Sequence, residues 1–395
     1  MERAQPRGNY RQTNNLRKQK NSSAHLPQWS SKPDKVFTRI ELDTKFYEGQ
    51  DVEGIHLMTD FDHVRELQVR LARFSKGPDD FFPVNWPVSL STKYIKKLTP
   101  SQYVVAPKPN GPRFLLYVDS SGEMFLENMT QHIFCVDEDR AVKMNSFDGR
   151  PVIDTVLDGV FCKEKLNRDD KCTGGEESSE KLTFVIRDAI RCNGVDLTGM
   201  NIVERTGFVK KEIIEPRLEA LKNIKGFDQN EAFTLDIVEY LEASEAESYL
   251  SAEFEERYIY PIRSFIFFPR TKGYVCKTNF DIFQWAENDD QKCSFRLRIK
   301  EQEEAELFIY GRDCAEEFYE KILLTDEIRN LDGCIIDCRY VDHRWVFVKQ
   351  RFDRKIPNGH RALNGKLSAL ENPVSRELLV WHLGTLAFFL ATMAK

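Results

Sequence analysis

The sequence predicts an α+β fold in which short strands dominate and one long helix lies in the middle of the chain. Two observations support this prediction. Short apolar runs bounded by turn residues, which are typical of strands, occur before residue 190 and again after residue 294. Between them, residues 202–221 form a long segment with a helical pattern. A chain of 395 residues is long enough for one large domain and a smaller one.

The individual elements follow from the turn signals. Residues 114–119 and 123–126 flank the tripeptide Ser-Ser-Gly, a pattern typical of a β-hairpin. Residues 167–181 are polar, charged and contain glycine, so we expect an exposed loop there. The remaining strands are expected at residues 154–161, 184–190, 306–310, 333–340 and 344–349.

Residues 1–37 are expected to form a disordered basic tail. Arg, Lys and uncharged polar residues dominate this segment, so it cannot bury enough apolar surface to offset its chain entropy. The basic stretch at residues 16–20 is compatible with RNA contact or nuclear import, and a solubilising role is the simpler interpretation. Because the start of the chain is polar, we expect no secretory signal.

Composition narrows the function classes. A formal net charge of −6 argues against coating of nucleic acid by the whole surface, while it allows a local basic cleft. The nine cysteines lack the paired spacing of a structural zinc site, and we expect them to be reduced thiols. These features predict a nuclear or cytoplasmic protein without a metal site.

Two basic motifs lie far apart in the chain. Residues 108–113 read Lys-Pro-Asn-Gly-Pro-Arg and precede an apolar strand, and residues 351–358 read Arg-Phe-Asp-Arg-Lys-Ile-Pro-Asn. Glycine lets the backbone approach a ligand, arginine holds phosphate or sugar oxygens, and a lysine amine is a nucleophile. The first motif taken alone is equally compatible with a solvated surface turn.

Together with Phe-Pro-Val-Asn-Trp-Pro-Val-Ser at residues 82–89, the order of these motifs resembles the guanylyltransferase half of animal mRNA capping enzymes. The resemblance runs from about residue 81 to residue 383. It does not extend to the triphosphatase half, because the sequence has no His-Cys phosphatase loop. It implies a two-sheet nucleotidyltransferase domain at residues 38–293, a C-terminal OB-fold barrel at residues 294–383 and an apolar tail at residues 384–395.

The resemblance also implies roles for individual residues. In this family the lysine at the position of Lys108 is covalently guanylylated, and the late basic motif orients the outer phosphates of GTP. The residues expected to contact a nucleotide are Arg113, Arg263, Trp285, Arg351, Asp353 and Arg354.

Several positions depart from the family pattern. Asn110 stands where the family has aspartate, and Val160 replaces the glutamate of Leu-Asp-Gly-Glu. Gln284 and Ala286 replace two lysines that hold the α-phosphate, while Arg263 replaces an aspartate linked to the metal. A hydrogen bond to a charged group contributes roughly 1.5–3 kcal/mol, so the combined losses predict a rate lower by several decades.

We therefore expect a guanylyltransferase-like protein that is catalytically inactive and binds a guanine nucleotide or the cap of RNA without a cofactor. One alternative is an active mRNA guanylyltransferase that transfers GMP from GTP to RNA through Lys108 and needs Mg²⁺ or Mn²⁺. Another is an adaptor that binds protein and no nucleotide, for which the acidic segment at residues 239–256, expected to be the exposed face of a helix, is the docking surface. The apolar run at residues 378–394 is shorter than the ~20 residues of a membrane span, which favours a packed helix over a membrane anchor.

Overall fold

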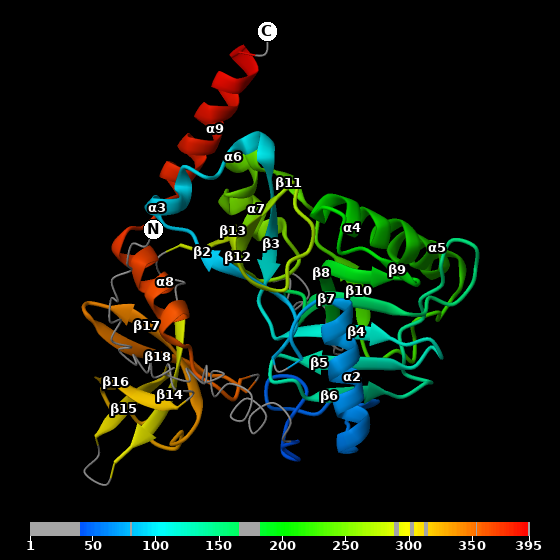
Figure 1. Cartoon of the computed structure of the whole chain (residues 1–395), viewed down its shortest axis with the longest axis horizontal. Coiled ribbons are helices and arrows are strands. Elements are labelled where there is room, and N and C mark those ends of the chain that lie inside the picture. The colour runs from blue at the N-terminus through cyan, green and yellow to red at the C-terminus, as the bar shows by residue number, and fades with distance from the viewer. Residues whose placement is uncertain are drawn as a thin grey trace, which may run out of the picture.

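The structure, a computed structural model, describes residues 40–79, 81–165, 182–287, 292–300, 304–311, 315–352 and 354–393, with side chains to residue 385. The basic tail predicted at residues 1–37 and the loop predicted at residues 167–181 lie outside the described residues. Three sheets and the helices that pack on them make up the described chain (Figure 1).

The largest sheet holds the predicted hairpin. Its strands, in spatial order, are β1 (Ile55–Leu57), β6 (Ile133–Val136), β5 (Met124–Asn128), β4 (Arg113–Val118), β7 (Thr155–Cys162), β8 (Thr183–Cys192) and β10 (Thr234–Ile237), with β9 (Val195–Asp196) paired to β8. Every residue of β4 and β7 is buried, and apart from Arg113, Thr155 and Asp158 the two strands are made of nonpolar residues and Tyr117. The predicted strands before residue 191 are therefore confirmed.

Helices cover both faces of this sheet (Figure 1). On one face, α2 (Phe61–Phe74) packs Val64, Leu67 and Leu71 into a core with the strands, and the Asp60 side chain caps its first turn. On the other face lie α4 (Ile202–Val209), a π-helical turn (Lys210–Ile214) and α5 (Glu215–Asn223). The predicted helix at residues 202–221 is confirmed, and Asn201 with Glu204 forms a capping box at its start.

The second sheet has the order β11 (Leu241–Glu242), β3 (Tyr103–Pro109), β12 (Ile262–Pro269), β13 (Lys277–Trp285) and β2 (Asn85–Ser89). Short helices α3 (Thr92–Ile95), α6 (Ala246–Tyr249) and α7 (Ala252–Arg257) lie beside it. The prediction of one helix across residues 239–256 is wrong. Tyr249 turns into the core, and Ser251 caps a separate helix, so the acidic segment is broken into short pieces.

The third sheet has the order β16 (Glu316–Ile322), β15 (Ala305–Tyr310), β14 (Lys292–Ile299), β17 (Ile335–Val341) and β18 (Arg344–Gln350). Neighbouring strands are antiparallel, and β16 also contacts β18, so the sheet closes on itself. This is the strand order of an OB-fold barrel. Phe295 and Trp345 lie in its core. The α+β prediction, with a two-sheet domain followed by a barrel, is confirmed.

Two helices end the described chain. The first, α8 (His360–Glu371), lies between the barrel and β2, and α9 (Arg376–Met393) begins against the second sheet and then extends away from the body (Figure 1). Leu379 and Leu383 of α9 are buried in the core of the second sheet. Among the described residues, no helix has the length and apolarity needed to cross a membrane.

Candidate nucleotide site

The turn at residues 110–112 joins the two sheets of the large domain. Lys108 lies at the end of β3 in the second sheet, whereas Arg113 opens β4 in the large sheet. Gly111 packs against β7 so closely that an added Cβ would lie 1.8 Å from the Phe161 carbonyl oxygen. The Phe161 N–H also donates to the Pro112 carbonyl at 3.0 Å. Glycine is thus required here by close backbone approach rather than by a positive φ.

Lys108 is half-buried and its amine faces other cations. Its Nζ lies 3.5 Å from Oε1 of Gln284. Gln284 is on β13, and β12 lies between β13 and β3 in the sheet. The pKa of Lys108 lies well below its ordinary value, because burial disfavours the charged amine and because Arg263 and Arg187 repel a further positive charge. This environment favours the neutral amine, and an anion bound beside it would favour the protonated form.

Arg113 is held by the protein itself. Its guanidinium donates from Nε to Asp158 Oδ1 at 2.7 Å and from a terminal nitrogen to the second oxygen of the same carboxylate. It also donates to the Asn85 carbonyl at 2.8 Å and to the Asn85 side chain at 3.1 Å. The buried Arg113–Asp158 pair and the bonds to Asn85 connect β4 with β7 and β2. Most N–H groups of the Arg113 guanidinium therefore already have acceptors within the fold.

Beyond Lys108, the barrel supplies a second group of cations. Arg351 follows β18, is buried, and donates to Asp337 on β17 at 3.0 Å. Arg354 donates to the Ser294 hydroxyl at 2.9 Å, and that hydroxyl donates to Asp337 at 2.5 Å. Although burial alone raises the pKa of Asp337, the charge of Arg351 holds this pKa below its ordinary value. The late basic motif is therefore anchored to the barrel through one carboxylate.

Lys366 completes this group from α8. It donates to the Lys292 carbonyl, and burial lowers its pKa to about 8, with a further contribution from Arg263. Both Arg263 and Lys366 also act electrostatically on Asp337. The large domain and the barrel therefore bring their cations to the same place.

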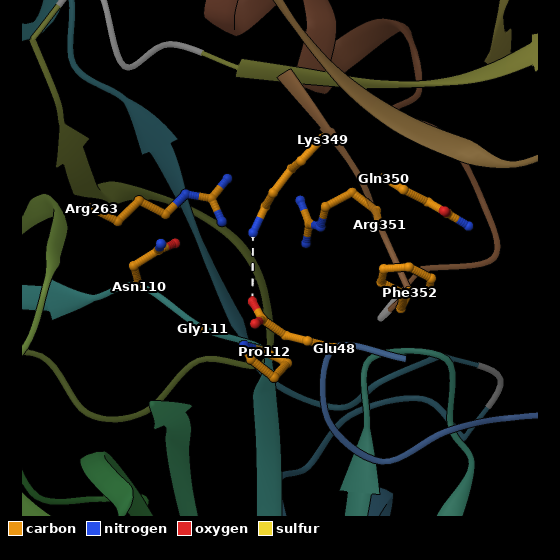
Figure 2. Close-up of a pocket in the computed structure, with 9 residues that line it drawn as sticks. All are labelled: Glu48, Asn110, Gly111, Pro112, Arg263, Lys349, Gln350, Arg351 and Phe352. Atoms are coloured by element: carbon orange, nitrogen blue, oxygen red, sulfur yellow. Dashed lines mark ion pairs between the residues drawn. The ribbon is translucent and has the colours of Figure 1, made fainter. Parts of the chain in front are cut away.

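A pocket of about 250 Å³ lies where the two domains meet. Figure 2 shows Arg263 pointing into it from the left, Lys349 from the top and Arg351 from the right, with Glu48 facing Lys349 from below and Asn110 beside Arg263. Gln350 points away from this space (Figure 2). The remaining lining residues are Gly111, Pro112 and Phe352.

The structure brings together some of the predicted nucleotide contacts and separates others. Lys108, Arg263, Arg351 and Arg354 lie near one another, whereas Trp285 is buried in the core of the second sheet. The Trp285 indole donates to the Val374 carbonyl at 2.7 Å, which fixes the start of α9. Asp353 lies outside the described residues.

The structure also locates two of the positions at which the resemblance predicts a departure from the family pattern. Val160 is fully buried in β7, where it pairs with Arg113 of β4 in the strand register. Ala286 is buried just after the end of β13. Among the described residues, no group of three or more His, Cys, Asp or Glu side chains could hold a metal ion.

Sequence reasoning missed Glu48, Lys349 and Lys366. Lys366 lies in an ordinary helical pattern, and Glu48 and Lys349 lie about 300 residues apart in sequence, so no local motif marks them. The Glu48-Gly49 dipeptide within a short turn was the one available signal for the first of them.

Comparison with known proteins agrees with this architecture. A family model for the mRNA capping enzyme catalytic domain matches residues 47–288, and one for the mRNA capping enzyme C-terminal domain matches residues 268–380. The mRNA-capping enzyme of Danio rerio is 25% identical over 357 residues, which cover 87% of this chain and 56% of that protein, so the chain spans about half of this relative.

Two further similarities extend the comparison. The mRNA-capping enzyme subunit alpha of Yarrowia lipolytica is 24% identical over 350 residues, covering 81% of this chain and 86% of that protein. Among solved structures, a mycobacterial DNA ligase D complexed with ATP covers 70% of this chain at 13% identity and a TM-score of 0.36. Since the catalytic-domain match alone takes in more than half of the sequence, this chain belongs to the mRNA capping enzyme family.

Proposed function

We propose that this chain binds a guanine nucleotide, or the triphosphate-linked cap of an RNA, in the cleft between the large domain and the barrel. The observation that carries the proposal is the convergence of cations there. Arg263 from the second sheet and Lys349 and Arg351 from the barrel line the pocket. Lys108, Arg354 and Lys366 are not among the lining residues, and they lie close enough to act electrostatically on Arg263 or on one another. A triphosphate carries several negative charges, and charge-assisted hydrogen bonds from Arg and Lys are the usual means of holding it.

The same cleft supports binding without a metal ion. Metal-dependent transfer requires carboxylates to hold the cation beside the phosphates. Here Val160 and Arg263 occupy two positions at which the family has carboxylates, and Arg263 supplies a fixed positive charge instead. We therefore infer that the ligand is bound by side-chain charge alone and that no covalent GMP adduct forms.

One observation favours the second candidate, an active guanylyltransferase. The lowered pKa of Lys108 increases the fraction of neutral amine near pH 7, which is what attack on an α-phosphate requires. Against it stand Gln284 and Ala286, which cannot neutralise that phosphate as lysines would.

The two candidates differ in a simple experiment. The purified chain is incubated with [α-³²P]GTP and either Mg²⁺ or Mn²⁺, and the denatured protein is examined for label, with Lys108→Ala as control. The proposal expects no labelled band from either protein. A band that is present in the wild type and lost in Lys108→Ala would establish the active enzyme.

Binding itself is measured by calorimetric titration with GTP and with a cap analogue, with and without EDTA. We expect binding that EDTA leaves unchanged and that weakens as salt rises, since exposed phosphate contacts are screened. Binding that requires Mg²⁺ would contradict the metal-free site, and no binding of either ligand would refute the proposal and favour the adaptor.

A further inference from the structure

The turn Tyr47–Gln50 holds one acidic side chain in an unusual conformation. Tyr47 and Gln50 exchange backbone hydrogen bonds of 3.0 and 2.8 Å, and the two residues between them both have positive φ, 45° at Glu48 and 83° at Gly49. This is the pattern of a tight turn that favours Asn-Gly. Glycine suits the second position, whereas a residue with a Cβ such as glutamate disfavours the positive φ at the first. The fold therefore holds Glu48 in place despite a local penalty.

This turn belongs to the large domain and is docked on the barrel. A Cβ added to Gly49 would lie 3.1 Å from the Phe352 ring, so the turn and the ring are in close contact. Nearby, Glu41 pairs with Lys355 at 2.6 Å. The position of Glu48 is therefore set by contacts with both domains.

From this turn the Glu48 carboxylate enters the cation-lined pocket. It lies 3.8 Å from Lys349, and Arg263 and Arg351 point into the same space (Figure 2). A separation of 3.8 Å is too long for a direct hydrogen bond, and both partners of this pair are about half exposed. Glu48 thus contributes a negative charge among cations, and its pair with Lys349 is loose.

We propose that Glu48 is an intramolecular competitor of anionic ligands, a carboxylate that occupies the pocket until a phosphate group displaces it. This inference rests on the proposed function, since it concerns the same cleft. Like charges a few ångströms apart repel, so an incoming phosphate must either move Glu48 or bind beside it at a cost. Once displaced, Glu48 frees Lys349 to contact the ligand.

The expected size of the effect is modest. Glu48 and Lys349 are both about half exposed, so solvent screens much of the repulsion between the Glu48 carboxylate and an incoming phosphate. Removing the carboxylate should therefore tighten binding of a polyphosphate about three- to tenfold.

The test uses the full chain and sodium tripolyphosphate, titrated by calorimetry at low salt. Glu48→Asn removes the charge and creates the Asn-Gly sequence that suits the turn, so it should fold at least as well as the wild type. Glu48→Gln provides a second neutral variant. The matched control is Glu53→Gln, which makes the same change in net charge at a residue paired with Arg140 outside the pocket.

We expect both Glu48 variants to bind tripolyphosphate three- to tenfold more tightly than the wild type, and Glu53→Gln to stay within about twofold. Equal affinity in Glu48→Asn and Glu53→Gln would overturn the competition, as would an absence of tripolyphosphate binding by every variant. GTP titrations separate this result from the proposed function. If the wild type and Glu48→Asn bind GTP with equal affinity, only the proposed competition is overturned. If neither protein binds GTP while Glu48→Asn still binds tripolyphosphate more tightly than the wild type does, the competition is supported and the nucleotide site is refuted.

Discussion

Replacing Arg351 with alanine should destabilise the barrel as well as weaken ligand binding. The Arg351 guanidinium is buried and donates to both oxygens of Asp337, at 3.2 and 3.0 Å. The side chain of Asp337 is only 1% exposed. Removing one partner of a buried ion pair costs about 3–5 kcal/mol, because the remaining charge stays buried without that partner. An exposed arginine replaced by alanine costs about 0.5 kcal/mol or less.

Unfolding of the barrel is best followed by itself, since a chain with several domains need not unfold in one step. Hydrogen–deuterium exchange of peptides from β17 and β18 at increasing urea reports on the barrel alone. The control is Arg344→Ala, an exposed arginine at the start of β18. We expect a loss of about 3 kcal/mol or more for Arg351→Ala, and partial recovery when Asp337→Asn is added.

The same pair predicts a pH dependence. Because Arg351 holds the pKa of Asp337 below its ordinary value, the stability from this pair is complete above the unfolded-state pKa. It should be lost as the pH falls through the folded-state pKa, and Arg351→Ala should flatten this acid limb. If Arg351→Ala costs no more than Arg344→Ala at neutral pH, the structural role assigned to the pair is wrong.

Three further predictions concern other parts of the molecule. Arg354→Ala, which removes a half-buried side chain bonded to a hydroxyl, should weaken GTP binding about tenfold with little change in melting temperature, and unchanged affinity would remove it from the site. Gly111→Ala should prevent correct folding of the large domain, since its Cβ would overlap the Phe161 carbonyl, and a soluble variant with wild-type melting temperature would contradict that geometry. Burial raises the pKa of Glu127 to about 8, so stability should fall as the pH rises from about 4.5 towards 8, by about 3 kcal/mol at pH 7. Glu127→Gln should remove this fall, and a parallel pH profile in the variant would refute it.

Local sequence predicted most elements of the large domain. The β4–β5 hairpin follows from Ser-Ser-Gly between two apolar runs, and both strands are buried as such runs suggest. The long helix from residue 202 follows from its helical pattern, and the structure adds a capping box of Asn201 and Glu204 at its start. The prediction for the acidic segment at residues 239–256 was wrong because its charges suggest one exposed helix, whereas the chain there forms a short strand and short helical pieces, with Tyr249 buried against the second sheet.

The candidate site divides in the same way. The resemblance carried by short segments around strands pointed to Lys108, Arg263 and the late basic motif as candidates. Only the tertiary structure decided which of the expected residues share a cleft. It also showed that Trp285 is buried in a core and that Arg113 is already paired with Asp158. It also added Lys366 and Glu48, whose neighbours are remote in sequence. The physical reason is that periodicity and turn chemistry act over a few residues, whereas the electrostatic environment of a site depends on side chains brought together by long-range packing.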